Sequence, residues 1–159
     1  MKVSLSFLTI RRLCILALLA SFLALPACAI AAERQMEARL VWGTDHDKPD
    51  DPSLKPLDGS LAKKLKSLPL KFKNYFEVNR QFFAINDKGY KRVEMSKKCY
   101  IEVKDKGESR VTVKLYGEGK LVRRVDDPLP KGETLGIAGD TKDGSAWLVI
   151  VQPVEPKGK

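Results

Sequence analysis

The sequence predicts an all-β protein, an antiparallel β-sandwich of about seven or eight strands with one short helix. Three observations support this fold class. Apolar and charged side chains alternate along most of the chain beyond residue 33, turn-forming residues recur between the alternating segments, and only residues 60–67 show helical spacing. The immunoglobulin arrangement is one form of sandwich that fits this pattern.

Residues 1–32 differ from the rest of the chain and have the order of a secretory signal. Lys2, Arg11 and Arg12 precede an apolar run, and Pro26 and several small residues follow it. A basic start, a short apolar segment and a small-residue cleavage site are typical of a signal for export. The sequence therefore predicts a protein that leaves the cytoplasm.

Cleavage of this signal would define the mature chain. We expect it near Ala31 or Ala32, where small residues are spaced as signal peptidases require. Residues 33–153 are then predicted to form a single β-sandwich domain, of a length that can bury a core of its own. Residues 154–159 are expected to form a flexible tail.

Two alternatives remain open for the N-terminal segment. LPAC at residues 25–28 resembles the bacterial lipobox, which implies a lipoprotein-type signal that ends before Cys28 and a lipid anchor on that cysteine. Residues 13–32 are also apolar over the ~20 positions that a membrane-spanning helix needs. All three interpretations predict export to the periplasm or the extracellular space, and the last two add a tether to the membrane.

A strand and a long loop open the predicted domain. Residues 36–42 alternate between apolar and other side chains, which predicts a strand that ends at Gly43. Residues 44–59 are rich in Pro and Asp and have no apolar period, so we expect a loop longer than most.

The helix is predicted at residues 60–67. Leu61 and Leu65 stand one helical turn apart, and Pro69 follows the last turn. Ser60 is placed to cap the first turn with its hydroxyl group. The helix is therefore short, with one apolar face.

Period-two alternation returns beyond the helix. Leu70 to Val78 alternate with charged residues, and Asn79 and Arg80 then break the phase, which predicts a bulge or a tight turn. Turn chemistry at residues 86–89 separates this strand from the next.

Residues 92–104 are predicted to form one long strand. Its charged face is expected in water and its apolar face in the core, with Lys97 as the one exception in the apolar phase. The residues assigned to the core are Val93, Met95, Cys99, Ile101 and Val103.

Turns and strands fill the last third of the domain. Residues 105–107 and 117–119 have hairpin turn chemistry, and a short strand is predicted near residues 134–138. Residues 146–151, AWLVIV, do not alternate. A continuous apolar run of strand length predicts a strand in the middle of a sheet, buried on both faces.

Cysteine usage excludes an internal disulfide in the mature domain. Cys14 and Cys28 lie in the export segment, so Cys99 is the single cysteine of residues 33–159. Packing must then stabilise the domain even in an oxidising compartment. Because Cys99 is in phase with Ile101, we expect its thiol to be buried and unreactive.

No catalytic set is predicted, and no cofactor. The single histidine, His46, lies between Asp45 and Asp47, and these three residues form a candidate metal site. Adjacent residues rarely converge on one ion, so an exposed acidic loop is the competing interpretation. The sequence contains no nucleophile elbow, zinc-protease motif, phosphate-binding loop or dinucleotide fingerprint.

The basic residues offer a second candidate site. The formal net charge is +9, and a cluster of lysines near Phe72 and Phe76 is a candidate surface for a polyanion. In the competing interpretation, these aromatic rings belong to the core and the lysines are merely solvated. The cluster comprises Lys63, Lys64, Lys66, Lys71 and Lys73.

These features predict a non-catalytic exported module that binds or assembles with a protein partner in a bacterial-type cell envelope. Two alternatives stay open. The lysine cluster would bind an anionic envelope component, such as a lipid headgroup or a polysaccharide. The carboxylates of residues 43–59 would serve an enzyme. Export argues against nucleic acid as the partner.

Overall fold

The computed structural model describes residues 33–47, 51–66, 72–142 and 145–155. The predicted export segment, with its lipobox and the alternative membrane anchor, lies outside these residues, as does Lys71. Residues 31–159 form one compact unit with a hydrophobic core of its own. Among the described residues, no helix has the length and apolar character to cross a membrane.

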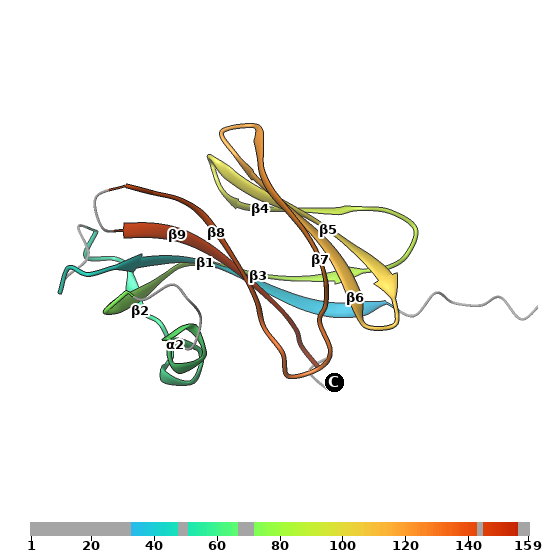
Figure 1. Cartoon of the computed structure of the whole chain (residues 1–159), viewed down its shortest axis with the longest axis horizontal. Coiled ribbons are helices and arrows are strands. Elements are labelled where there is room, and N and C mark those ends of the chain that lie inside the picture. Colours follow the sequence, from blue (N-terminus) through green and yellow to red (C-terminus); the bar gives the residue numbers. More distant parts are fainter. Residues whose placement is uncertain (1–32, 48–50, 67–71, 143–144, 156–159) are drawn as a thin grey trace, which may run out of the picture. The chain divides into compact units, whose positions relative to one another are not determined.

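Two antiparallel sheets make up the fold, which confirms the predicted all-β sandwich (Figure 1). The five-stranded sheet has the order β2-β3-β1-β9-β8 and consists of β1 (Arg34–Thr44), β2 (Lys55–Pro56), β3 (Asn74–Ile85), β8 (Leu135–Lys142) and β9 (Ser145–Pro153). The four-stranded sheet has the order β4-β5-β6-β7 and consists of β4 (Lys91–Ser96), β5 (Cys99–Gly107), β6 (Arg110–Gly117) and β7 (Lys120–Pro128). The helix α2 spans Gly59–Lys66.

The main core lies between the two sheets and follows from the alternation of apolar residues. On β1, Met36, Ala38 and Leu40 face the four-stranded sheet, where Val103 and Val113 are fully buried against them. Each buried aliphatic side chain contributes roughly 1.5–3 kcal/mol through removal of its surface from water.

The central strand predicted at residues 146–151 is confirmed. β9 lies between β1 and β8, and both of its faces are buried. Val149 and Val151 face the main core, whereas Leu148 and Ile150 face a second core on the other side of the sheet. The apolar run is continuous because neither face of this strand meets water over most of its length.

The helix α2 covers the second face of the five-stranded sheet and creates this second core. Leu61 and Leu65 are buried there with Val41 and Tyr75. The predicted apolar face of the helix is therefore confirmed. Figure 1 shows α2 on the side of this sheet away from β4–β7.

The helix cap differs from the prediction. Asp58 caps α2, because its Oδ1 accepts a hydrogen bond from the Leu61 backbone N–H at 3.0 Å. Ser60 instead lies inside the helix and donates its hydroxyl to the same carboxylate oxygen at 2.7 Å. A carboxylate at this position satisfies a free N–H group and lies at the positive end of the helix dipole.

The prediction of one long strand over residues 92–104 is wrong. Lys97 and Lys98 form a turn between β4 and β5, in which Ser96 pairs with Cys99 and accepts a hydrogen bond from the Lys98 N–H at 3.2 Å. The ladder shifts register at Met95, a bulge that keeps both Met95 and Cys99 on the core side. Because the apolar residues keep the same phase on both sides of the turn, their alternation gives no sign of the turn.

The phase break after Val78 is a bulge. β3 continues to Ile85, and the pairing with β1 skips Val78 between Glu77 and Asn79. The immunoglobulin arrangement is not observed, because the four-stranded sheet pairs only strands that are consecutive in sequence.

Tight hairpin turns explain this simple meander. Glu108 and Ser109 have φ values of 50° and 60°, and Glu118 and Gly119 have φ values of 50° and 79°. Two consecutive residues with positive φ give the turn whose twist matches that of paired strands. The two turns join β5 to β6 and β6 to β7.

Candidate functional site

A cavity of about 820 Å³ opens between the two sheets at one end of the sandwich. Figure 1 shows the strands of the two sheets diverging there, with the turns β4–β5 and β6–β7 on one side and the adjoining ends of β8 and β9 on the other. The lining residues come from both sheets and are Leu40, Val78, Ser96, Lys97, Lys98, Cys99, Leu115, Tyr116, Gly117, Glu118, Val122, Gly139, Trp147 and Val149.

The cavity arises because the inner face of the five-stranded sheet extends beyond the closed core. Along β9, exposure rises from 0% at Val151 and 1% at Val149 to 50% at Trp147. Trp147 pairs with Trp42 of β1, and both lie in the phase of the residues that face the four-stranded sheet. Trp147 is thus half exposed at this end, where it lines the cavity together with Val122 of the opposite sheet.

A row of aromatic side chains supports the exposed tryptophan. Trp147 stacks on Trp42 with 6.5 Å between ring centroids and 29° between ring planes. Trp42 also contacts Phe76 of β3, with 6.1 Å between the centroids. Aromatic pairs contribute ~0.5–1.5 kcal/mol beyond their buried area, so this row holds Trp147 in place while its other face remains available.

The opposite wall comes from β5, β6 and β7. Pairing between β6 and β7 shifts from Leu115 with Arg123 to Tyr116 with Leu121, and Val122 is the additional residue of this bulge. A Cβ atom on Gly117 would lie 3.2 Å from Cγ2 of Val122. The glycine therefore leaves room for Val122 in the wall of the cavity.

Cys99 lies in this wall and is only partly buried. Its side chain packs against the main core, which agrees with the face predicted for it. Burial raises the pKa of the Cys99 thiol, and the negative charge of Glu94 raises it further. A higher thiol pKa lowers the fraction of reactive thiolate at neutral pH.

The two hairpin turns form the polar rim of the cavity. The Glu118 N–H donates to the Lys98 carbonyl oxygen at 2.7 Å, and Nζ of Lys98 lies 3.2 Å from Oε1 of Glu118. Lys97 is exposed beside this pair, and no described residue forms an ion pair with it. The rim therefore carries one lysine charge that the adjacent glutamate does not neutralise.

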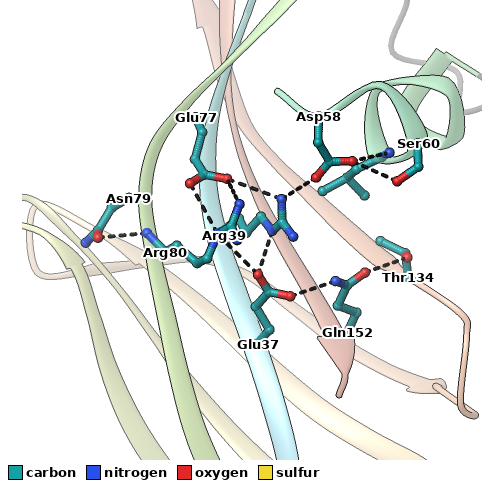
Figure 2. Close-up of polar contacts among 10 residues, drawn as sticks. Glu37, Arg39, Asp58, Ser60, Glu77, Asn79, Arg80, Thr134 and Gln152 are labelled. Atoms are coloured by element: carbon teal, nitrogen blue, oxygen red, sulfur yellow. Dashed lines mark hydrogen bonds and ion pairs between the residues drawn. The ribbon is translucent and has the colours of Figure 1, made fainter. Parts of the chain in front are cut away.

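A second polar cluster lies on the other face of the five-stranded sheet, next to α2 (Figure 2). Its centre is Arg39, whose guanidinium lies 2.7 Å from Glu37, 2.7 Å from Asp58 and 3.2 Å from Glu77. Arg80 bridges the same two glutamates, at 3.3 Å from Glu37 and 2.7 Å from Glu77.

This cluster links the helix to the sheet. Arg39 lies on β1, Glu77 on β3, and Asp58 is the cap of α2. Glu37 is only 3% exposed, and its second carboxylate oxygen accepts a hydrogen bond from the Gln152 amide at 2.8 Å. Each carboxylate of the cluster is held by a guanidinium, so the arrangement favours a structural role over proton transfer.

The candidate metal residues do not converge. Asp45, His46 and Asp47 are exposed. Asp45 accepts a hydrogen bond from the Lys73 N–H at 3.1 Å, and the His46 carbonyl oxygen accepts one from the Asn74 amide at 2.9 Å. Within the described ranges, no group of His, Cys, Asp and Glu side chains is arranged to hold a metal ion.

The lysine cluster is divided between two elements. Lys63, Lys64 and Lys66 are exposed on α2, and the ammonium of Lys64 donates to the Gly132 carbonyl oxygen at 2.9 Å. Lys73 lies just before β3, beside the Asp45 loop.

The aromatic residues predicted near these lysines do not share one environment. Phe72 packs against the second core next to α2, whereas Phe76 contacts Trp42 on the main-core side. The two rings therefore pack on opposite faces of the five-stranded sheet, with Phe76 buried and Phe72 partly buried, which agrees with their interpretation as core residues.

The outer face of the four-stranded sheet carries aromatic and charged side chains. Tyr100 and Tyr116 stack with 4.5 Å between their centroids, and the Arg92 guanidinium lies 3.7 Å from the centre of the Tyr100 ring. Tyr116 also donates its hydroxyl to Glu102 at 3.1 Å. Both faces of Tyr100 are thus covered, which leaves no free face of that ring on which a ligand can stack.

Sequence reasoning did not identify the cavity. Two signals were present: Lys97 broke the apolar phase of its segment, and Trp147 stood in an apolar run next to a turn. Comparison with protein-family models, curated proteins and solved structures gave no significant match. The candidate site therefore rests on the geometry of this chain.

Proposed function

We propose that this protein is a non-catalytic, exported binding module of the cell envelope that takes an apolar ligand into the cavity between its sheets. The observation that supports this function is the combination of a volume of about 820 Å³, apolar walls and an exposed Trp147. Cavities that hold small ligands are mostly apolar, have ~300–1,000 Å³ and carry few polar groups.

Binding fits the residues better than catalysis does. Three acids of the loop proposed for an enzyme, Asp45, Asp51 and Asp58, accept hydrogen bonds from backbone N–H groups. Hydrogen bonds from Ser53 lower the pKa of Asp51, and the bond from Leu61 is the main cause that lowers the pKa of Asp58. A carboxyl group with a lowered pKa is a weak general base at neutral pH.

Export is the second part of the proposal, and residues 1–32 support it through their basic start, apolar run and small-residue end. Expression of the full chain in a bacterial host, followed by cell fractionation and mass measurement, tests it. The expected result is a periplasmic product that begins near residue 33 or at a lipidated Cys28. A full-length product confined to the cytoplasm would contradict export.

The binding part is tested with N-phenyl-1-naphthylamine, an uncharged probe that fluoresces in apolar surroundings. We expect saturable binding to residues 31–159. Trp147→Ala should weaken it about fivefold, because aromatic contacts contribute ~1 kcal/mol. Val122→Glu should also weaken it, since a carboxylate at the mouth opposes entry of an apolar molecule.

Phe82→Ala is the matched control. Phe82 is exposed like Trp147, but it pairs with Glu37 of β1 and so lies on the opposite face of the sheet. The control should bind the probe like the unmodified protein. Absence of saturable binding, or equal binding by Trp147→Ala and the unmodified protein, would refute the cavity as the binding site.

A second candidate function is binding of anionic envelope lipid by the lysines of α2. The observation that favours it is the exposure of Lys63 and Lys66 on one short helix, where no described acidic residue forms an ion pair with either of them. Co-sedimentation with anionic vesicles at low and high salt tests it, because salt screens exposed charges. Equal binding by a variant with Gln at Lys63, Lys64 and Lys66 would exclude this surface.

A further inference from the structure

We infer that the ligand of the cavity is a fatty acid, whose hydrocarbon chain lies between the sheets and whose carboxylate lies at Lys97. This inference rests on the proposed function and specifies its ligand. It follows from three features of the cavity: the separation of polar from apolar lining, the charge of the rim, and the continuity of the walls with the core.

The lining is polar at one edge and apolar elsewhere. Its charged and hydroxyl-bearing side chains, apart from Tyr116, come from the β4–β5 turn and the β6–β7 turn. The remaining walls are aliphatic, aromatic, glycine or the Cys99 thiol. A ligand that satisfies such a cavity has a polar group at one end and an apolar body, because burial of unpaired polar groups is unfavourable.

The charge of the rim selects an anion. Lys98 is engaged by Glu118 at 3.2 Å, which leaves the positive charge of Lys97 at the mouth without an ion-pair partner among the described residues. A carboxylate here would form a charge-assisted hydrogen bond with the lysine ammonium. A cationic head would meet Lys97 and be repelled.

The walls favour a thin, flexible body. Leu40, Leu115 and Val149 belong both to the main core and to the cavity lining, so the cavity continues the layer of side chains between the sheets. Packed sheets lie about 10 Å apart, and this layer is filled by aliphatic groups. A hydrocarbon chain would extend this layer with groups of the same kind and contact the exposed part of Trp147.

Three amphiphiles with the same hydrocarbon chain and with an anionic, a neutral or a cationic head group test the inference. Dodecanoate, dodecanol and dodecyltrimethylammonium, each at a concentration at which it is dissolved as single molecules, are titrated into residues 31–159. Displacement of the naphthylamine probe is followed. Dodecanoate should bind about threefold more tightly than dodecanol at low salt, as expected for an exposed ion pair, and dodecyltrimethylammonium should bind least. High salt should remove the preference.

Variants assign the preference to the rim. Lys97→Gln should abolish the difference between dodecanoate and dodecanol, whereas Lys63→Gln, on α2, should keep it. Trp147→Ala should weaken all three ligands alike.

The outcomes separate this inference from the proposed function. Probe binding with equal affinity for the three amphiphiles, or a preference that survives Lys97→Gln, overturns the fatty-acid assignment and leaves the apolar binding function in place. Probe binding that none of the amphiphiles displaces also overturns it and favours a different apolar occupant. Failure of the probe itself overturns both.

Discussion

At the scale of single residues, Arg39 is the centre of the polar cluster between α2 and the five-stranded sheet. It holds Glu37, which is nearly inaccessible to water, and also reaches Asp58 and Glu77. Without Arg39, the buried carboxylate of Glu37 would keep only the longer contact with Arg80 at 3.3 Å. Loss of one partner from a buried ion pair costs ~3–5 kcal/mol. The geometry of the cluster thus explains why an arginine is tolerated on a central strand.

We expect Arg39→Met to destabilise the protein by about 3 kcal/mol, measured by urea unfolding at neutral pH. Methionine keeps much of the side-chain volume, so the lost stability measures the effect of removing the positive charge. The additional change Glu37→Gln should recover part of the stability, because it removes the buried carboxylate. An Arg39→Met variant as stable as the unmodified protein would contradict this role.

Asp58 acts both as helix cap and as ion-pair partner, and its pKa lies well below the ordinary carboxyl range, mainly through the hydrogen bond from Leu61. A carboxyl group with a lowered pKa in the folded state stabilises the protein above its unfolded pKa of about 3.9. This contribution is lost as the pH falls below that value towards the folded pKa.

Asp58→Ala should therefore cost about 1 kcal/mol at neutral pH, the usual loss for a helix cap. Asp58→Asn should cost less, since asparagine also caps helices. The stability difference between the unmodified protein and Asp58→Asn should shrink between pH 7 and pH 3 in urea unfolding. A difference that grows on acidification would contradict the assigned pKa shift.

At the scale of elements, α2 contributes side chains to the second core and none to the main core between the two sheets. Leu65 is 1% exposed between the helix and the sheet. Leu65→Ala should cost ~2–5 kcal/mol through lost burial and the resulting cavity. The strand signal in circular dichroism should persist at low temperature, because the main core does not include this residue. Loss of all strand signal under those conditions would show that the sheets depend on the helix.

The strands also show where alternation of apolar residues predicts the structure correctly and where it does not. Alternation located the inner faces of β5 and β6, whose other faces carry charged and aromatic side chains. It also located the inner face of β1, although both faces of that strand are buried. It missed the β4–β5 turn, since the bulge at Met95 preserves the apolar phase across Lys97 and Lys98. It also assigned the helix cap to Ser60, because Asp58 stood inside an acidic loop with no local signal of its contact with Arg39.

At the scale of the whole molecule, the fold class was predictable and the candidate site was not. Strand content and the central position of β9 follow from the order of apolar residues. The cavity depends on how far the two sheets cover one another, which is a tertiary property. In the sequence, Trp147 is one residue of an apolar run. Only the structure shows that it is 50% exposed.

The central claim is that the open end of the sandwich is a binding site, and a heteronuclear NMR titration tests it most directly. Residues 31–159, labelled with nitrogen-15, are titrated with dodecanoate. The largest shift changes are predicted at the Trp147 indole and at the amides of the rim, Lys97 to Cys99 and Gly117 to Glu118, with little change at Lys63 to Lys66. Changes centred on α2, or none at the Trp147 indole, would contradict the account.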